Sequence, residues 1–319
     1  MVYDCIRADV RVFLFVMVAL MQVRSGQLYV IAAAVLWGTT GTAQALAPSG
    51  ADPIGVGTLR LLVGGLGLLG FALVRGGLQR PHTWPLKPVL GAGLSVAVYQ
   101  LCFFGGVART GVAVGTIIAI GSAPVMAGML GWWLRGDRPS WRWYLATALA
   151  VMGAGFLILS GGDNRVDLTG ILLALGAGLA YALYTVASKQ LLDHYAPGAV
   201  MAVIFCLGAV FLLPLLFVVD LHWLAEPGGL LMIIHLGLIA TTLSYILFAQ
   251  GLRMIFAATA VTLSLAEPLT AAILGIVLLG ERLTSAIMVG IGLLLAGLLL
   301  LSVPESLLKR MKRVHHEFP

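Results

Sequence analysis

The chain has 319 residues, of which 60% are hydrophobic and only 10% are charged. Soluble domains carry about 25% charged residues, so this composition excludes a soluble enzyme or binding domain and predicts a polytopic membrane protein. The formal net charge is +6. We attribute this excess of cations to loops beside the membrane, and we expect no nucleic-acid partner.

Ten apolar segments of about the length that crosses a bilayer, roughly 20 residues, follow one another along the chain. Their apolar runs are continuous and do not alternate with period two, which favours helices over a membrane barrel. We therefore predict an all-α polytopic membrane protein with ten transmembrane helices. The predicted spans are 28–47, 54–74, 88–108, 113–134, 142–160, 169–188, 199–219, 229–251, 256–279 and 284–303.

The second half of the chain repeats the first at a constant offset of 144 residues, which relates Trp37 to Tyr181 and Pro124 to Pro268. Each half holds five predicted spans. Because five is odd, the second half is expected to lie inverted in the membrane relative to the first, an arrangement typical of transporters. The predicted divisions are an N-terminal extension (1–27), two five-helix repeats (28–160 and 169–303) and a basic tail (304–319). For the extension, a misassigned start and an interfacial helix both stay open.

The distribution of cations predicts the orientation in the membrane, because Lys and Arg accumulate in cytoplasmic loops. With the amino terminus inside, 15 of the 19 cations fall on the cytoplasmic side. Only Arg109, Arg165 and Arg282 fall outside, and Arg60 lies within a span. We expect a multi-pass protein of the cytoplasmic (inner) membrane with both termini cytoplasmic.

Pro124 and Pro268 occupy matching positions in the fourth span of each half. A proline inside a helix removes a backbone hydrogen bond and favours a kink. Paired breaks at corresponding positions of two repeats indicate a transport site. We predict that both prolines act as hinges.

Two charged residues, Arg60 and Glu267, lie within predicted spans. A charge at the bilayer centre costs about 2.5–3.5 kcal/mol on insertion scales, so such residues are candidates for function. Glu267 either titrates or binds a cationic group during transport, or it bonds to backbone freed by Pro268. Arg60 either binds a carboxylate or is a structural cation that snorkels or pairs with a neighbouring helix.

Polar and aromatic side chains within the spans are the other candidates for a substrate cavity. Aromatic rings with a polar tip offer contact area and a hydrogen bond together, although each residue alone is compatible with plain packing. Trp37 and Tyr181 stand out because they occupy equivalent positions in the two repeats. The candidates are Trp37, Thr40, Gln44, Arg60, Tyr99, Gln100, Tyr181, Tyr184, Ser244, Tyr245 and Glu267.

Several short motifs, in their order and spacing, resemble the drug/metabolite transporter (DMT) superfamily and its ten-span EamA-type branch. They are Ala34-x-x-Trp37-Gly38, Arg60, Ala123-Pro124, Gly136-Asp137-Arg138, Ala180-Tyr181-Ala182, Glu267-Pro268 and Gly280-Glu281-Arg282. The resemblance covers about residues 28–303. It implies a secondary transporter, often an exporter of amino acids and other small metabolites, with a central cavity between the repeats.

These features predict secondary-active export of a small polar metabolite, such as an amino acid or its derivative, by alternating access. An exporter of drugs or lipophilic cations is the nearest alternative, and a membrane scaffold or sensor that transports nothing is an alternative of another class. The expected partners are a small-molecule substrate and membrane lipid, and proton coupling stays open. Because the sequence has no nucleotide loop, paired-carboxylate site or nucleophile triad, we expect neither enzymatic activity nor a cofactor or metal. The oligomeric state is not indicated.

Overall fold

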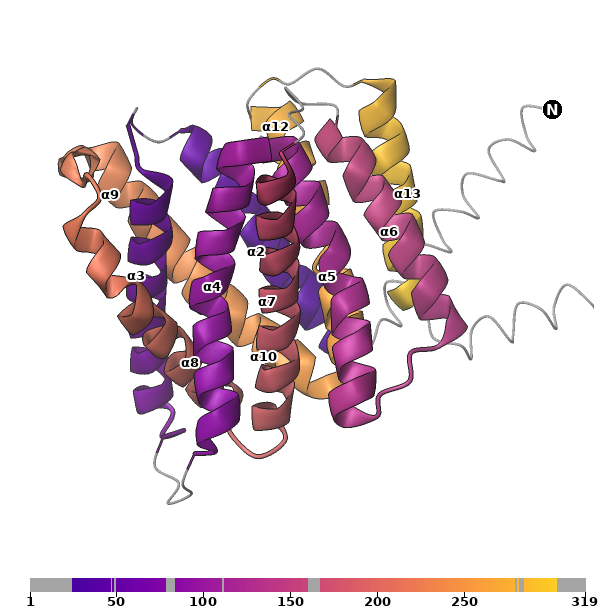
Figure 1. Ribbon diagram of the computed structural model, residues 1–319, viewed down its shortest axis with the longest axis horizontal. Coiled ribbons are helices and arrows are strands. Elements are labelled where there is room, and N and C mark those ends of the chain that lie inside the picture. The colour runs from indigo at the N-terminus through magenta and orange to yellow at the C-terminus, as the bar shows by residue number, and fades with distance from the viewer. Residues whose placement is uncertain are drawn as a thin grey trace, which may run out of the picture.

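The computed structural model describes residues 25–46, 48, 50–78, 84–110, 112–159, 167–278, 280 and 284–302, and these residues form helices and connecting turns without a strand (Figure 1). The predicted tail and nearly all of the predicted N-terminal extension lie outside this part of the chain. Within it, the helices begin and end within a few residues of the predicted spans. In the second half three predicted spans are interrupted, by a 3₁₀ turn, a π-helix and a turn between two helices.

In the described residues of the first half there are five helices: α2 (Ser25–Ala45), α3 (Pro53–Val74), α4 (Leu86–Thr110), α5 (Val112–Arg135) and α6 (Trp141–Leu159). Local sequence explains where α3 begins. The Asp52 side chain accepts a hydrogen bond from the Gly55 amide at 2.8 Å, and Pro53 occupies the first turn, where its missing N–H is not needed. Helix α5 continues through Pro124 without interruption.

The second half is more interrupted. It contains α7 (Leu168–Leu192), α8 (Pro197–Leu212), two short 3₁₀ turns η1 (Leu213–Phe217) and η2 (His222–Ala225), then α9 (Pro227–Ile234), the π-helix η3 (His235–Leu243), α10 (Ser244–Met254), α11 (Ala257–Leu263), α12 (Ala266–Leu278) and α13 (Ser285–Ser302). Segments α9, η3 and α10 form one continuous helical rod, whereas α11 and α12 are separated by a turn at Ser264 and Leu265. Neither the π-helix nor this turn has a signal in the apolar pattern.

Among the residues that the structure describes, seven helical stretches are long and apolar enough to cross a membrane: Pro53–Val74, Leu86–Val107, Leu168–Leu192, Pro197–Phe217, Pro227–Met254, Ala257–Leu278 and Ser285–Ser302. They agree with a multi-pass membrane protein, but they do not confirm the predicted count of ten. Large apolar side chains also face outward, including Leu73, Trp133 and Phe217, which are 61%, 77% and 88% exposed. In lipid such exposure carries no hydrophobic penalty.

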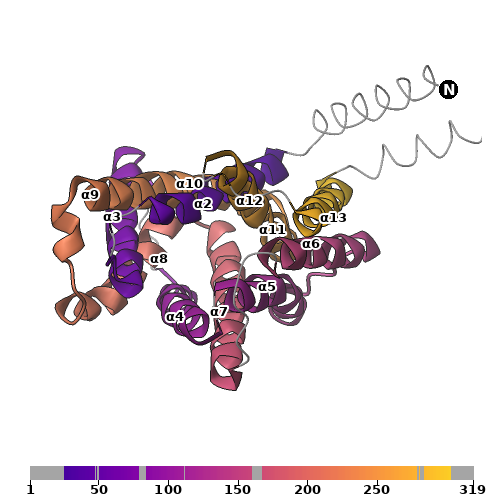
Figure 2. The same cartoon turned by 90° about the horizontal axis from the view of Figure 1, so that it is seen from above.

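The two halves are interleaved. Helix α4 packs along α7, α3 along α8, and α6 along α13, while α2 contacts α10 and α12. In the view from above, α2, α10 and α12 lie along one side of the bundle and α4, α5 and α7 along the other (Figure 2). Some of these contacts require glycine: a Cβ at Gly153 of α6 would lie 2.6 Å from the Leu294 nitrogen of α13.

The helices run between two ends of the bundle. At the first, called the Lys189 end, α5, α7 and α10 finish and α2 begins, with Gly26 packed against Met254. At the second, called the Arg109 end, α4 finishes and α7 begins, with Gly170 packed against Arg109. The space between the two ends holds the candidate site.

Candidate functional site

A cavity of about 90 Å³ lies near the middle of the bundle. Its walls combine six aromatic side chains, two charged groups and several small or aliphatic residues. The lining residues are Trp37, Thr40, Arg60, Leu61, Val96, Tyr99, Gln100, Ala119, Ile120, Tyr181, Tyr184, Phe205, Tyr245, Ser264 and Glu267. Nine of the eleven residues proposed from the sequence therefore come together here, and the other two, Gln44 and Ser244, lie elsewhere.

Ser244 supports the cavity wall from behind. Its hydroxyl accepts a hydrogen bond from the Trp37 indole N–H at 2.8 Å and lies 2.8 Å from the Ala240 carbonyl. The residue is fully buried and does not line the cavity. Because Trp37 also packs against Tyr245, with ring centroids 4.9 Å apart, Ser244 holds this indole in one orientation between α2 and α10.

The turn between α11 and α12 brings backbone and side-chain polarity to the cavity. Ser264 lies in this turn and accepts a hydrogen bond from the Tyr181 hydroxyl at 3.3 Å, while its own hydroxyl donates to the Val261 carbonyl at 2.7 Å. The corresponding stretch of α5, around Pro124, is an unbroken helix. The two prolines thus lie in different local structures, and their role as hinges stays a prediction.

Arg60 and Glu267 are the charged groups of the cavity. Glu267 lies in the first turn of α12, where the helix dipole favours a negative charge. Among the described residues no ion pair or hydrogen bond joins it to Arg60, and the guanidinium Nε of Arg60 is buried without a hydrogen-bond partner. Unpaired charge of both signs in one cavity is costly in a membrane and is suited to a ligand that supplies the missing partners.

A wider vestibule of about 520 Å³ connects this cavity to the Arg109 end. The vestibule and the cavity share seven lining residues, namely Trp37, Thr40, Arg60, Tyr99, Gln100, Ile120 and Glu267. The vestibule continues along the last turns of α2, where Gln44 lies, and past Phe104 of α4. Gln44 is therefore placed on the route to the central cavity and not in it.

Six lining residues were not among the candidates because most of them lack a polar tip: Leu61, Val96, Ala119, Ile120, Phe205 and Ser264. The repeat itself carries a signal that finds some of them. The offset of 144 residues relates Leu61 to Phe205 and Ile120 to Ser264, and both members of each pair line the cavity. Equivalent positions of the two halves thus meet around one central space.

No group of His, Cys, Asp and Glu side chains that could hold a metal ion occurs in the part of the chain that the structure describes. The cavity offers instead hydroxyls, an amide, one guanidinium, one carboxylate and aromatic faces. This chemistry can bind a small polar molecule reversibly. A helical membrane protein with such a cavity and an access route to it is typical of a transporter.

The chain belongs to the EamA-like transporter family, which matches residues 24–159 and 168–303. The uncharacterized transporter YwfM of Bacillus subtilis (strain 168) is 45% identical over 289 residues, covering 90% of this chain and 97% of the relative. The threonine/homoserine exporter RhtA of Escherichia coli (strain K12) is 30% identical over 279 residues, covering 83% and 87%. One crystal structure of a protein at 19% identity has the same fold, with a TM-score of 0.76 over 86% of this chain and 96% of that one.

Proposed function

We propose that this chain is a secondary-active transporter that exports small polar metabolites, most directly amino acids or amino-acid derivatives, by alternating access. The observation that carries the proposal is the central cavity in which Arg60 and Glu267 face the same space without pairing. An amino acid presents the complementary pair of charges. Its carboxylate would bind the guanidinium of Arg60 and its ammonium group the carboxylate of Glu267, as charge-assisted hydrogen bonds.

The size of the cavity fits this class of substrate. About 90 Å³ is the volume of roughly three water molecules in the liquid, at about 30 Å³ each, so the cavity suits a small substrate. The aromatic faces of Tyr99, Tyr181 and Tyr245 supply contact area for its side chain. The name of the related threonine/homoserine exporter also supports an amino-acid substrate.

The proposed architecture is ten transmembrane helices in two inverted repeats. Helices α2, α5 and α6 contain 21, 24 and 19 residues. At about 1.5 Å per residue each is close to the roughly 30 Å thickness of a bilayer core. These three helices and the seven apolar stretches together make up the ten proposed transmembrane helices.

The inversion is supported by the direction of equivalent helices. Helix α2 begins at the Lys189 end, whereas its repeat partner α7 begins at the Arg109 end. The packing is also reciprocal, since α4 lies along α7 and the equivalent pair α10 and α2 lies together. Two such halves around one cavity are the arrangement in which rocking exposes a site alternately to either side.

We further propose that the Lys189 end is cytoplasmic, with both termini on that side of the inner membrane. The cations Arg135, Arg138 and Arg142 support this orientation, because they lie at or beside the connection between α5 and α6 at this end. In this orientation the vestibule opens away from the cytoplasm. The structure then corresponds to the state in which an exporter releases its substrate.

A drug or lipophilic-cation exporter is the second candidate, and the six aromatic side chains around Glu267 favour it. It differs from the first in the role of Arg60, which would repel a cation. A scaffold or sensor fits less well. That alternative predicts a fully paired Glu267 and a closed interior, whereas in the described part of the chain no ion pair or hydrogen bond engages the Glu267 side chain, which lies on an accessible vestibule.

The test is uptake of radiolabelled amino acids into inverted membrane vesicles, with and without an imposed proton gradient. We expect uptake of at least one small amino acid, lost in Glu267→Gln and strongly reduced in Arg60→Ala. Arg109→Gln is the matched control, because it removes a cation that lies outside the cavity and is 53% exposed. Uptake of lipophilic cations that survives Arg60→Ala would favour the second candidate. Absence of flux for both classes, from folded protein, would contradict the proposal.

A further inference from the structure

The cavity is closed toward the Lys189 end. A separate polar depression of about 450 Å³ lies at that end, among the ends of α5, α7 and α10 and the start of α11. It shares no lining residue with the central cavity, whereas the vestibule at the Arg109 end shares seven. The protein layer between this depression and the cavity must therefore part before the site can face the other side.

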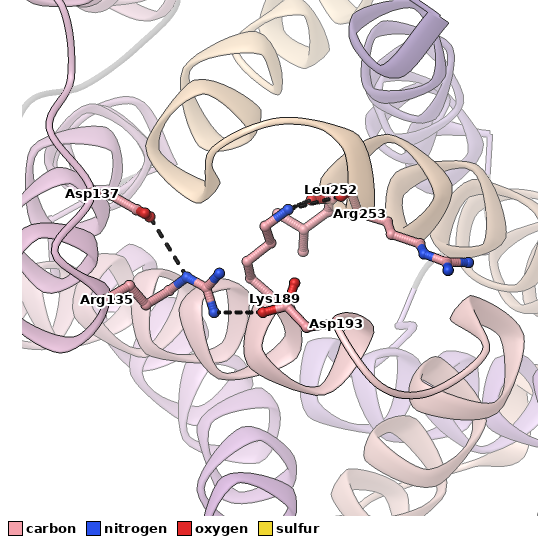
Figure 3. A network of polar contacts seen from close by, with 6 residues as sticks. All are labelled: Arg135, Asp137, Lys189, Asp193, Leu252 and Arg253. Atoms are coloured by element: carbon pink, nitrogen blue, oxygen red, sulfur yellow. Dashed lines mark hydrogen bonds and ion pairs between the residues drawn. The ribbon is translucent and has the colours of Figure 1, made fainter.

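Charged side chains line this depression, and Figure 3 shows how they lie relative to one another. The guanidinium of Arg135, at the end of α5, lies between two carboxylates. One of its terminal nitrogens is 3.0 Å from the Asp193 carboxylate, just after α7, and its Nε is 3.6 Å from the carboxylate of Asp137. Arg135 is 18% exposed and Asp137 14%, whereas Asp193 is 40% exposed. Because Arg135 belongs to the first half and Asp193 to the second, this ion pair joins the two halves.

Lys189 extends the set to a third helix. Its ammonium group donates hydrogen bonds to the Leu252 and Arg253 carbonyls in the last turn of α10, at 2.8 and 2.9 Å. These carbonyls have no partner within the helix, and the negative end of the helix dipole favours a cation there. The ends of α5, α7 and α10 are thus tied together by two adjacent cations.

Only one other ion pair between the halves is found among the described residues, and it lies at the Arg109 end. Arg109 and Asp167 are 3.8 Å apart and are 53% and 38% exposed. Exposed pairs of this kind contribute little, whereas the Arg135 guanidinium is 18% exposed and lies 3.0 Å from Asp193, so solvent screens this shorter pair less. The two ends therefore differ in how firmly charge holds the halves together.

We propose that Arg135, with Asp137, Asp193 and Lys189, forms the cytoplasmic gate of the transporter, an ion-pair closure that holds the cavity shut on the Lys189 side and separates when the site turns inward. The inference rests on the alternating access proposed above. It does not depend on which substrate is carried. Separation of Arg135 from Asp193 frees α5 to move away from α7, and loss of the Lys189 bonds frees the end of α10.

The experiment measures access to a cysteine in the cavity from each side of the membrane. Thr40 lines both the cavity and the vestibule and is half-buried, so Thr40→Cys is introduced after Cys5, Cys102 and Cys206 are replaced by alanine. A membrane-impermeant maleimide is applied to right-side-out and to inverted vesicles, without substrate. In the parent protein we expect rapid labelling from the outside and slow labelling from the cytoplasmic side.

Asp193→Asn and Arg135→Gln should each raise the rate of cytoplasmic labelling by about tenfold or more, since either change removes a charge-assisted hydrogen bond from the closed state. Arg135→Lys keeps the positive charge beside Asp137 and Asp193 and should hold the rate near the parent value, which a merely misfolded protein would not do. Arg109→Gln, which breaks the exposed pair at the opposite end, is the matched control and should leave both rates unchanged.

Cytoplasmic labelling that stays at the parent rate in both Asp193→Asn and Arg135→Gln, each shown to be folded by its normal external labelling, would overturn the gate. Fast cytoplasmic and slow external labelling of the parent protein would instead show that the proposed orientation is reversed. Because the readout needs no substrate, failure of the transport assay and failure of the gate can be told apart.

Discussion

At the Arg109 end the two halves of the molecule are joined by an exposed ion pair, and a vestibule of about 520 Å³ leads from the cavity toward that end. At the Lys189 end they are joined by a shorter, partly buried pair that lines a depression separate from the cavity. Because an exposed pair contributes only about 0–1 kcal/mol and solvent screens the guanidinium of Arg135 less than that of Arg109, we infer that charge contributes more to closure at the Lys189 end.

Blocking the open end should have the largest effect on transport. Gly41 lines the vestibule, and a Cβ added there would have no heavy atom within 4 Å. Gly41→Cys in the cysteine-free protein should therefore fold and transport normally. A bulky impermeant thiol reagent added from the outside should then abolish nearly all transport in reconstituted vesicles. Thr259→Cys, in the depression at the Lys189 end, is the counterpart and should react from the cytoplasmic side only. Equal reaction of Gly41→Cys from both sides would contradict the difference between the ends.

Removing the charge that faces the open route should have the next largest effect. Arg60 lines both the cavity and the vestibule and has no ion-pair partner among the described residues. If it binds the substrate carboxylate, Arg60→Ala should raise the KM for an amino acid by roughly 10- to 150-fold, corresponding to about 1.5–3 kcal/mol for a hydrogen bond to a charged group. Arg60→Lys should recover part of this loss. An unchanged KM in both variants would leave Arg60 a structural cation.

Much of this arrangement is predictable from the sequence where apolar length or the repeat determines it. The continuous apolar runs define helices such as α3 and α8, and equivalence in the repeat singles out Trp37 and Tyr181, which both line the cavity. Phe205 is not found by polarity, because its ring has no polar tip, although its repeat partner Leu61 also lines the cavity.

Other features depend on contacts between distant helices and leave no local pattern. Ser244 is a polar residue within a predicted span, as the cavity residues are. In the folded protein, however, it lies behind Trp37, fully buried and hydrogen-bonded to the indole. The ion pair between Arg135 and Asp193 joins two residues that flank loops and lie 58 positions apart. The residues around Arg135 in the sequence do not indicate that Asp193 is its partner. Likewise, the break at Ser264 and Leu265 has no counterpart at the equivalent part of α5.

The close contact between helices α6 and α13 tests the packing of the two halves apart from the ion pairs at either end. Gly153→Ala would place a Cβ 2.6 Å from the Leu294 nitrogen, a backbone atom that cannot turn aside. We expect a loss of about 1–3 kcal/mol in stability, measured as a lower midpoint of thermal unfolding in detergent. Gly155→Ala on the same helix is the control, because its added Cβ meets nothing within 4 Å. Equal stability of the two variants would contradict close packing at Gly153.

The smallest expected effect separates the two roles of Asp167 at the Arg109 end. Its carboxylate lies 3.8 Å from Arg109, and the same side chain accepts a hydrogen bond from the Gly170 amide at 2.9 Å, capping α7. Asp167→Asn keeps a capping oxygen and loses only the exposed pair, so stability should change by less than about 1 kcal/mol. Asp167→Ala loses the cap as well and should cost about 1 kcal/mol more. Since the cap and not the pair does the stabilising, Arg109→Gln should match Asp167→Asn in thermal unfolding. A loss in Arg109→Gln as large as that in Asp167→Ala would show that charge also holds this end, and the distinction between the two ends would then rest on geometry alone.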